Sequence, residues 1–372
     1  MHNVSRAASA PRFWLAWVAG VALAGASVVM SLTQGIPIRD PDDVMPAYVQ
    51  MPLIVLGAIG LDIVPRVLRR AGRPGAGWAG RLVAQWRGVV TERWPASHLR
   101  FALSGLAAWY LSYAAFRNVK NMAPFVHPHI YDDNLADIDQ FLFAGHDPAA
   151  VLHAWFGTDL AAHFFSGVYV LWIGLVPATI AIALVWTRHT RAGEWYVTAV
   201  AVDWAVGALL YVLLPTVGPI YSDSSEFASL PHTYVSDLQH AMWDDRVSVL
   251  ADPVGTHALQ TIAAFASLHV GIMVTICLIG ELIALPRWVR VFSWIFLVAT
   301  ILATVYLGWH FACDVLGGFA LGAFAVWSAG VATGNRVGWR LRLTPEGVGP
   351  SVAHPVAPAP RSAPLPDRPA AD

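Results

Sequence analysis

Residues 288–332 read WVRVFSWIFLVATILATVYLGWHFACDVLGGFALGAFAVWSAGVA. Their only charged residues, with histidine neutral, are Arg290 and Asp314. A helix needs about 20 apolar residues to cross the hydrocarbon core of a bilayer, and one helix over this whole stretch would overshoot it. The stretch therefore predicts two membrane-spanning helices, 288–307 and 309–332, with a break around Gly308. His310 and Asp314 then lie where the second helix begins.

Apolar stretches of similar length occur throughout the chain, which is 56% apolar and 13% charged. A soluble domain carries about a quarter charged residues, so this composition is typical of a membrane protein. The remaining candidate spans are 13–33, 46–64, 99–117, 161–186, 195–214 and 261–284. The sequence therefore predicts an all-α integral membrane protein with about eight transmembrane helices. The first stretch is too long for the core of a signal peptide and is expected to be retained.

The charged residues between these stretches predict the orientation, because Lys and Arg gather on the cytoplasmic side. Most arginines lie in the N-terminal segment and in every second connection after it, among them Arg66, Arg69, Arg70, Arg73, Arg81, Arg87 and Arg93. The other connections are rich in acids instead, including Asp132, Asp133, Asp137, Asp139, Asp223, Asp237 and Asp244. We therefore expect cytoplasmic N- and C-termini in a multi-pass protein of the cell membrane. His310 and Asp314 fall on the extracytoplasmic side.

Two long outer connections, 118–160 and 215–260, are candidates for function. The first contains a short amphipathic pattern at 137–143, and its aspartates are expected to lie at the interface or to cap helices. The tail beyond Thr344 is rich in Pro and Ala and is expected to be disordered. Two cysteines in apolar runs form no metal or disulfide pattern, and a net charge of −1 without a basic stripe argues against nucleic acid as a partner.

His310 and Asp314 are the most informative polar pair. A spacing of four residues places them one helical turn apart on one face. Asp314 can then hold one ring nitrogen of His310 and leave the other free as a nucleophile. A structural hydrogen bond between helices is the alternative for such a pair.

Two further polar groups fall on the same predicted side. Ser267 is a candidate N-cap for the span that starts beside His269, and a helix N-terminus favours an anion such as phosphate. His269 could protonate a leaving oxygen there. Arg117 and Lys120, the only lysine in the chain, lie at the outer end of the third span and could hold phosphate oxygens. An interfacial histidine and lipid-headgroup contacts are the alternatives.

The order of these groups resembles the type 2 phosphatidic acid phosphatase superfamily. Its three signatures are Lys-x6-Arg-Pro, Pro-Ser-Gly-His and Ser-Arg-x5-His-x3-Asp. The corresponding stretches here are Lys120-x6-His127-Pro128, Ala266-Ser267-Leu268-His269 and Ala303-Thr304-x5-His310-x3-Asp314. The resemblance implies a six-helix catalytic bundle within 98–332. We expect two added helices and an Arg-rich cytoplasmic loop in 1–97 before it, and a disordered cytoplasmic tail, 333–372, after it.

The resemblance also implies roles for the matching residues. His310, Asp314 and His269 become the catalytic residues, and Lys120, Arg117, Ser267 and His127 become candidates to hold phosphate, with no metal or cofactor. His127 and Thr304 replace the two family arginines, which leaves the source of positive charge open.

The context of Leu268 and Thr304, with Asp137-x-Asp139-x3-Phe143 and Pro215–Pro219, resembles the branch of inositol phosphorylceramide and sphingomyelin synthases. That branch implies transfer of a phospho-headgroup, such as inositol phosphate, from a phospholipid donor to a lipid alcohol through a phosphohistidine. Hydrolysis of a lipid phosphate or prenyl pyrophosphate is the alternative within the family.

Two other classes stay open from the residues alone. Asp62 and Asp203 could extend a proton path in a transporter. The histidines could instead bind haem or a metal, although no metal-ligand spacing occurs among them.

Overall fold

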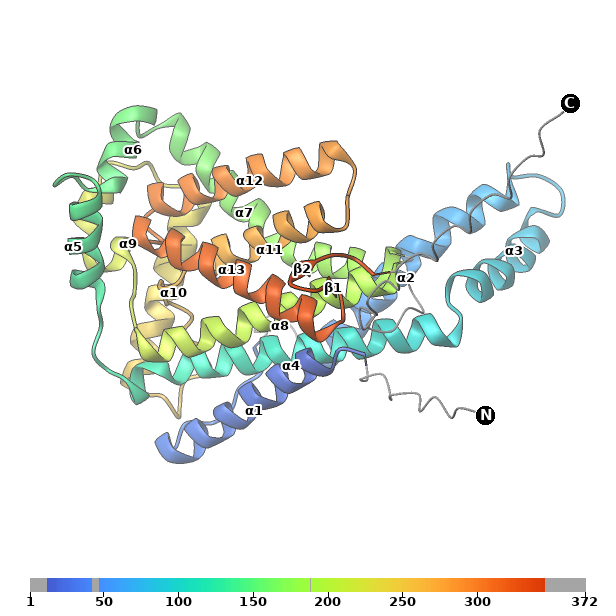
Figure 1. Cartoon of the computed structure of the whole chain (residues 1–372), viewed down its shortest axis with the longest axis horizontal. Helices are drawn as coiled ribbons and strands as arrows, with labels where there is room; N and C mark the ends of the chain where they lie inside the picture. The colour runs from blue at the N-terminus through green and yellow to red at the C-terminus, as the bar shows by residue number, and fades with distance from the viewer. Residues whose placement is uncertain (1–11, 42–46, 188, 345–372) are drawn as a thin grey trace, which may run out of the picture.

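The computed structural model describes residues 12–41, 47–187 and 189–344 (Figure 1). The first eleven residues and the tail from 345 lie outside the described residues. The secondary structure of the described part consists of helices and one short hairpin, joined by non-helical connections, and the protein is an all-α integral membrane protein. Its α-helices are α1 (Trp14–Gln34), α2 (Ala47–Ala71), α3 (Trp78–Arg93), α4 (Ala96–Val126), α5 (Asp132–Leu142), α6 (Pro148–Phe156), α7 (Leu160–Ala181), α8 (Thr190–Leu213), α9 (Pro219–Ser222), α10 (Tyr234–Ala251), α11 (Leu268–Leu282), α12 (Arg287–Tyr306) and α13 (Ala312–Ala332).

A helix lies at each of the eight predicted spans, namely α1, α2, α4, α7, α8, α11, α12 and α13. Among the described residues, five helices are long and apolar enough to cross a membrane: α1, α7 with its π-helical end η1 (Ile182–Trp186), α8, α12 and α13. The predicted break around Gly308 is confirmed, since α12 ends at Tyr306 and α13 begins at Ala312. Gly308 adopts a φ of +74°, a conformation that side chains with a Cβ rarely take.

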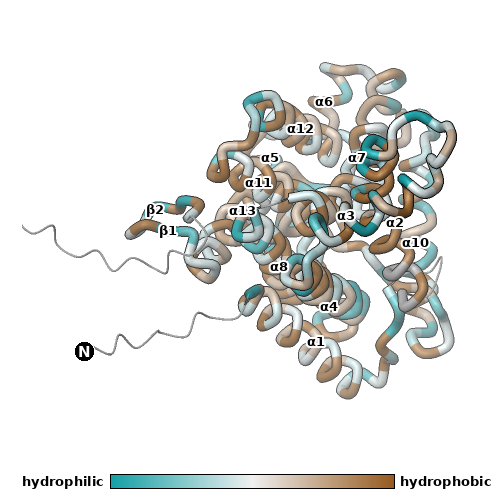
Figure 2. Tube along the Cα trace, turned by 90° about the vertical axis from the view of Figure 1, so that its right-hand side faces the viewer, coloured by the Kyte–Doolittle hydropathy of each residue, from teal (hydrophilic) through white to brown (hydrophobic). Residues whose placement is uncertain are grey.

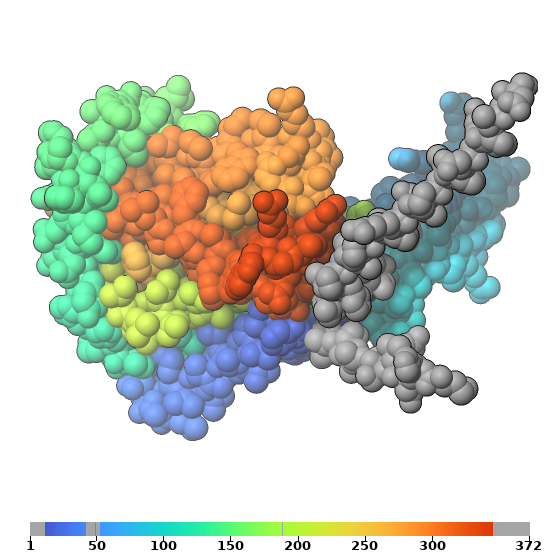
Figure 3. All heavy atoms as spheres, in the orientation of Figure 1, coloured from blue at the N-terminus to red at the C-terminus, as the bar shows by residue number. Residues whose placement is uncertain are grey.

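The connections hold more helix than the sequence predicts. In the Arg-rich loop, α3 packs on α2 to form a helical hairpin that projects from the bundle (Figure 3). The buried carboxylate of Asp62 joins the two helices, because it accepts from Arg93 at 2.8 Å and from Arg66 at 3.1 Å. In the outer connections α5 begins at Asp132, earlier than predicted, and α10 was not predicted.

The central helices pack as a sequence of neighbours, in which α4 contacts α1 and α8, and α13 contacts α8 and α11 (Figure 2). Glycines make the contact between α11 and α13 close. A Cβ atom added to Gly318 would lie 2.7 Å from the carbonyl oxygen of Ser267, and one on Gly322 would lie 2.3 Å from that of Gly271. Small residues let helix backbones approach in this way. The starts of α11 and α13, and with them the two histidines, are therefore held together.

The bundle has two distinct ends. At one end the indole nitrogen of Trp14 donates to the carbonyl of Ala332, so the start of α1 meets the end of α13. Helices α5, α6, α9 and α10, with the 3-10 turn η2 (Ser224–Phe227), cover the opposite end (Figure 1). The chain therefore enters and leaves the described bundle at one end, and the histidines lie towards the other.

The prediction of a disordered tail from residue 333 is wrong for residues 333–344. Strands β1 (Arg336–Val337) and β2 (Arg340–Leu341) pair there as an antiparallel hairpin. The side chain of Asn335 accepts from the backbone N–H of Thr344, and the Thr344 hydroxyl accepts from Arg191. These hydrogen bonds fold the segment back onto the end of α13.

Candidate active site

His310 and Asp314 lie on either side of the start of α13. The Nδ1 atom of His310 is 3.1 Å from Oδ2 of Asp314, and both side chains are buried. The same carboxylate oxygen accepts the backbone N–H of Phe311 at 3.1 Å. The pair was predicted on one helix face, but His310 precedes the helix and Asp314 stands in its first turn.

His269 completes a row of three polar groups. Its Nδ1 atom lies 3.0 Å from Nε2 of His310, and its ring packs against Trp172 and Tyr169 at centroid distances of 4.2 and 5.1 Å. Ser267 caps α11 through a hydrogen bond from the backbone N–H of Val270, as the sequence predicts.

This geometry defines what each nitrogen of His310 can do. Because Asp314 engages Nδ1, the other nitrogen, Nε2, is the one that can attack an electrophile. It is in hydrogen-bond contact with Nδ1 of His269, so this contact must open before Nε2 can attack. His269 then lies beside the attacking atom, where it can exchange a proton with a bound group. The arrangement therefore suits nucleophilic catalysis at a centre that carries a leaving oxygen.

Two aspartates of α5 fix the backbone around this row. Asp139 accepts the backbone N–H of Ala312 at 2.6 Å and that of Cys313 at 2.8 Å, so it caps the first turn of α13. Asp132 accepts the N–H of Val217 at 2.9 Å and that of Gly218 at 2.7 Å. Burial raises the pKa of both carboxyls, and the N–H donors oppose this rise.

The spacing of Asp132 and Asp139 in the sequence indicated that they act together. The two aspartates stand seven residues apart, on one face of a helix, and capping was one of the expected roles for the acids of this connection. Their targets were not predictable. Those of Asp132 lie 85 and 86 residues away in the sequence, and those of Asp139, at the start of α13, lie 173 and 174 residues away.

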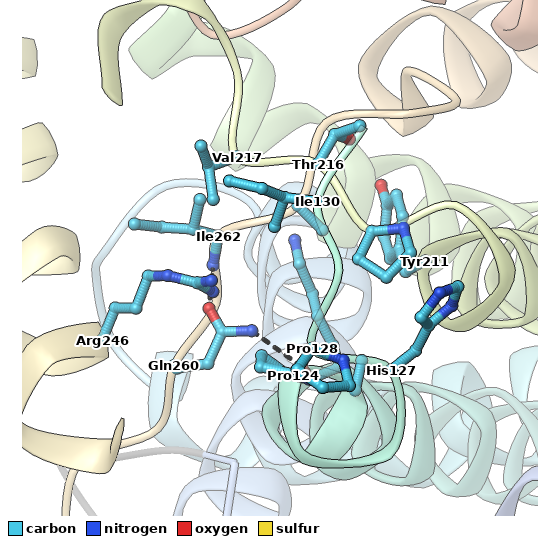
Figure 4. Close-up of a pocket in the computed structure, with 14 residues that line it drawn as sticks. Pro124, His127, Pro128, Ile130, Tyr211, Thr216, Val217, Arg246, Gln260 and Ile262 are labelled. Carbon is cyan, nitrogen blue, oxygen red and sulfur yellow. Dashed lines mark hydrogen bonds between the residues drawn. The ribbon is translucent and has the colours of Figure 1, made fainter. Parts of the chain in front are cut away.

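Lys120 lies near the same row. Its Nζ atom is 4.8 Å from the ring centre of Tyr211 and 5.8 Å from that of Phe116, and its charge acts electrostatically on His269. The hydroxyl of Tyr211 donates to the carbonyl of Ala266 at 3.4 Å, next to the cap of α11. Lys120 also lines a small cavity of about 20 Å³, shown in Figure 4, together with Arg246 of α10.

The other predicted phosphate contacts lie differently. Arg117 donates to the hydroxyl of Tyr113 at 3.5 Å and is absent from the lining of the cavity. His127 does line the cavity, but its Nδ1 atom is hydrogen-bonded to the carbonyl of Val212 at 2.9 Å. Thr304, at the position of a family arginine, is fully buried and donates to the carbonyl of Ile301. Arg246 is the cation that the sequence did not single out.

The two aspartates considered for a proton path lie in different parts of the protein. Asp62 is paired with arginines in the α2–α3 hairpin, whereas Asp203 accepts a hydrogen bond from Thr275 at 2.8 Å in the bundle core. Nowhere in the described ranges do three or more His, Cys, Asp or Glu side chains group as metal ligands would.

Comparison with known proteins gives one match. The family model described as the PAP2 superfamily, the type 2 phosphatidic acid phosphatases, matches residues 133–328, which is more than half of the chain and includes His269, His310 and Asp314. No curated protein and no solved structure matches the chain. The matched region contains the hydrogen-bonded row and both helix starts that carry it. This chain belongs to the PAP2 superfamily.

Proposed function

We propose that this protein is a membrane phosphotransferase that moves a phospho-headgroup from a phospholipid to a lipid alcohol through a phosphohistidine. The observation that carries the proposal is the row Asp314–His310–His269, with contacts of 3.1 and 3.0 Å. Membership of the superfamily supports an enzyme of the lipid phosphatase and phosphotransferase type.

In the first step Nε2 of His310 attacks the phosphorus atom of the donor and forms an N–P bond. The P–O bond to the departing lipid alcohol breaks, and His269 gives its proton to that alkoxide. Asp314 holds Nδ1–H and offsets the positive charge that develops on the ring. Lys120, whose charge acts on His269, binds the non-bridging oxygens.

In the second step an acceptor hydroxyl loses its proton to His269, and its oxygen attacks phosphorus. The N–P bond breaks, and both histidines return to their starting states. A lipid alcohol gives a new phospholipid-like product, whereas water gives hydrolysis. The two activities share every residue of the row and differ only in which hydroxyl reaches it.

Transfer is favoured over hydrolysis by the surroundings of the row. His310 is 3% exposed, and the segment that carries it is covered by groups of the outer connection. The side chain of Gln239 on α10 donates to the carbonyl of Leu307 at 2.8 Å, and the ring of Tyr221 contacts that of Trp309. Such cover restricts the access of water to His310.

The resemblance to the inositol phosphorylceramide synthase branch makes inositol phosphate our proposed headgroup. The start of α1 and the end of α13 lie opposite to α5, α6, α9 and α10, which suits an active site on the extracytoplasmic face of the cell membrane. The arginine distribution between the spans supports this orientation.

The test is turnover by the purified protein, with phosphatidylinositol as donor and a ceramide as acceptor. His310→Ala is expected to abolish product formation, and Asp314→Asn to lower kcat by about 10²–10⁴-fold. The matched control is His240→Ala, an exposed histidine of α10 outside the row. Full activity of the His310 variant would refute the mechanism. Release of free headgroup phosphate without a lipid product would instead establish the hydrolase.

A further inference from the structure

Another polar cavity lies at the end of the bundle opposite to the catalytic row. It has a volume of about 430 Å³ and is lined by Arg12, by residues of α4 within 97–104 and by Thr190. Small-molecule sites have volumes of about 300–1,000 Å³. Arg100, in the cavity wall, and Lys120, near the row, stand on the same helix about 30 Å apart, at a rise of 1.5 Å per residue. The cavity is therefore separate from the active site.

Three long helices begin around this cavity. Helices α1, α4 and α8 pack pairwise on one another (Figure 2), and the residues that line the cavity stand at their N-terminal ends. In the described ranges, the N-cap side chains of these three helices accept no hydrogen bond from the first turn. A helix N-terminus carries partial positive charge and N–H groups without helical partners, and both favour an anion. The positive ends of three helices therefore surround the cavity.

Two exposed arginines add full positive charges to these partial ones. The guanidinium group of Arg12 lies over the ring of Phe101, 5.4 Å from its centre. Arg100 donates from Nε to the carbonyl of Ala96 at 3.3 Å. Neither arginine forms an ion pair with another described residue. Their terminal N–H groups can therefore donate in pairs to the oxygens of a phosphate.

One buried carboxylate, that of Glu194 on α8, acts on this group of charges. It accepts the backbone N–H of Phe13 at 3.0 Å, so it joins the start of α1 to α8. The charges of both Arg12 and Arg191 act on it. One carboxylate therefore faces two arginines, and Arg100 adds a third positive charge, so the surroundings of the cavity stay positive.

Hydroxyl groups complete the wall on α4. Ser97, Arg100 and Ser104 recur three and four residues apart, so they lie on one face of this helix. The hydroxyl of Ser104 accepts from the indole N–H of Trp17 at 3.2 Å, which leaves its own O–H to donate. The cavity therefore offers hydrogen-bond donors of two kinds, hydroxyl and guanidinium, on the face of α4 that lines it.

We propose that this cavity binds the phosphate group of an anionic ligand, with Arg12 and Arg100 as its guanidinium partners. The ligand is either the headgroup of an anionic phospholipid or a free phosphate ester. The ends of membrane-spanning helices lie at the depth of lipid headgroups, and basic pockets between such helices bind headgroups in other membrane proteins. A phosphate bound here joins the starts of α1, α4 and α8, so it stabilises the bundle. The site goes beyond the proposed reaction and does not depend on it.

The binding test is thermal unfolding of the full chain in phosphatidylcholine nanodiscs with increasing proportions of phosphatidylglycerol. We expect phosphatidylglycerol to raise the Tm of the wild type. Arg100→Gln should need an about tenfold higher proportion for the same rise, since it loses a charged hydrogen-bond donor. Arg12→Gln should act in the same direction, and Arg100→Lys should lie between Arg100→Gln and the wild type. The matched control is Arg87→Gln, which removes an exposed arginine of α3 outside the cavity and should respond as the wild type does.

A second arm separates the two sources of phosphate. Inorganic phosphate and glycerol phosphate are titrated into nanodiscs of phosphatidylcholine alone. A rise in Tm with phosphatidylglycerol but not with these soluble probes identifies a lipid headgroup, and a rise with the soluble probes as well identifies a free phosphate ester.

Two results would overturn the proposal. The first is a Tm that none of these phosphates raises, and the second is an equal response of Arg100→Gln and Arg87→Gln. Because the row lies about 30 Å away along α4, His310→Ala should keep the Arg100-dependent response. An inactive protein that keeps this response would therefore reject the proposed reaction and not the cavity.

Discussion

Replacing Asp139 tests whether α5 positions the catalytic segment. The side chain is 3% exposed, and it accepts two backbone N–H groups of the first turn of α13, at 2.6 and 2.8 Å. A hydrogen bond to a charged group contributes about 1.5–3 kcal/mol net. Burial of the carboxylate raises the pKa of Asp139. The free-energy cost of this burial offsets part of the stabilisation that the two hydrogen bonds contribute.

We therefore expect Asp139→Ala to lower the free energy of unfolding by about 2–4 kcal/mol. Because the first turn of α13 carries Asp314 and follows His310, kcat should also fall by about 10–100-fold, as small displacements of catalytic groups do. KM should change much less, since no contact with the donor is removed. Asp139→Asn keeps one acceptor oxygen and should lie between the two proteins in both measurements.

The assay is denaturant unfolding in mixed micelles, with kcat and KM measured on the same preparations. The matched control is Asp137→Ala, which removes an exposed acid from the same helix. If both variants unfold within about 0.5 kcal/mol of each other, a difference expected of ordinary surface substitutions, α5 does not hold α13 and the argument fails.

Three further changes test other parts of the fold. Burial and the neighbouring carboxyl of Asp147 raise the pKa of Glu226 from 4.5 to about 7, so its contribution to stability is full below pH 4.5 and is lost as the pH rises through about 7. The Tm should fall between about pH 4.5 and pH 7, and Glu226→Gln should reduce that fall; an equal fall in both proteins would contradict the assignment. Gly318→Ala should lower the free energy of unfolding by about 1–3 kcal/mol through overpacking against α11, whereas Gly174→Ala on α7 meets open space and should be neutral; equal melting curves would contradict the close packing. Arg93→Ala leaves the buried Asp62 with only the half-exposed Arg66 as its partner. It should lower the free energy of unfolding by about 3 kcal/mol, the lower end for a broken buried pair, without changing kcat, and a loss of kcat would show that the α2–α3 hairpin contributes to the site.

The membrane-spanning helices were predictable because their signal is local. Apolar length and the distribution of arginines identified eight helical stretches, and the break between α12 and α13 followed from length alone. The missed helices are those whose stability depends on packing. For example, α3 is polar in composition and is held by Arg93 on Asp62, a contact 31 residues distant that no local pattern reveals.

The candidate site also contains residues that local motifs identify and one residue that they do not. His269, His310 and Asp314 could be proposed together because each lies near the outer end of a predicted span and each matches a signature of the family. Arg246 could not, because α10 was not predicted and an arginine in an acidic connection has no local pattern that indicates a cavity. The structure brings it to the cavity beside Lys120, 126 positions earlier in the chain by their numbers.

The glycine contact between α11 and α13 has a consequence for the enzyme in membranes of different thickness. Because Gly318 and Gly322 allow the two backbones to touch, the helices that carry His269 and His310 can tilt only as one unit. Hydrophobic mismatch is normally relieved by tilt or by local deformation of the lipid. A thicker or thinner bilayer would then change the depth of both histidines below the headgroups. The 3.0 Å distance between Nδ1 of His269 and Nε2 of His310 would stay the same.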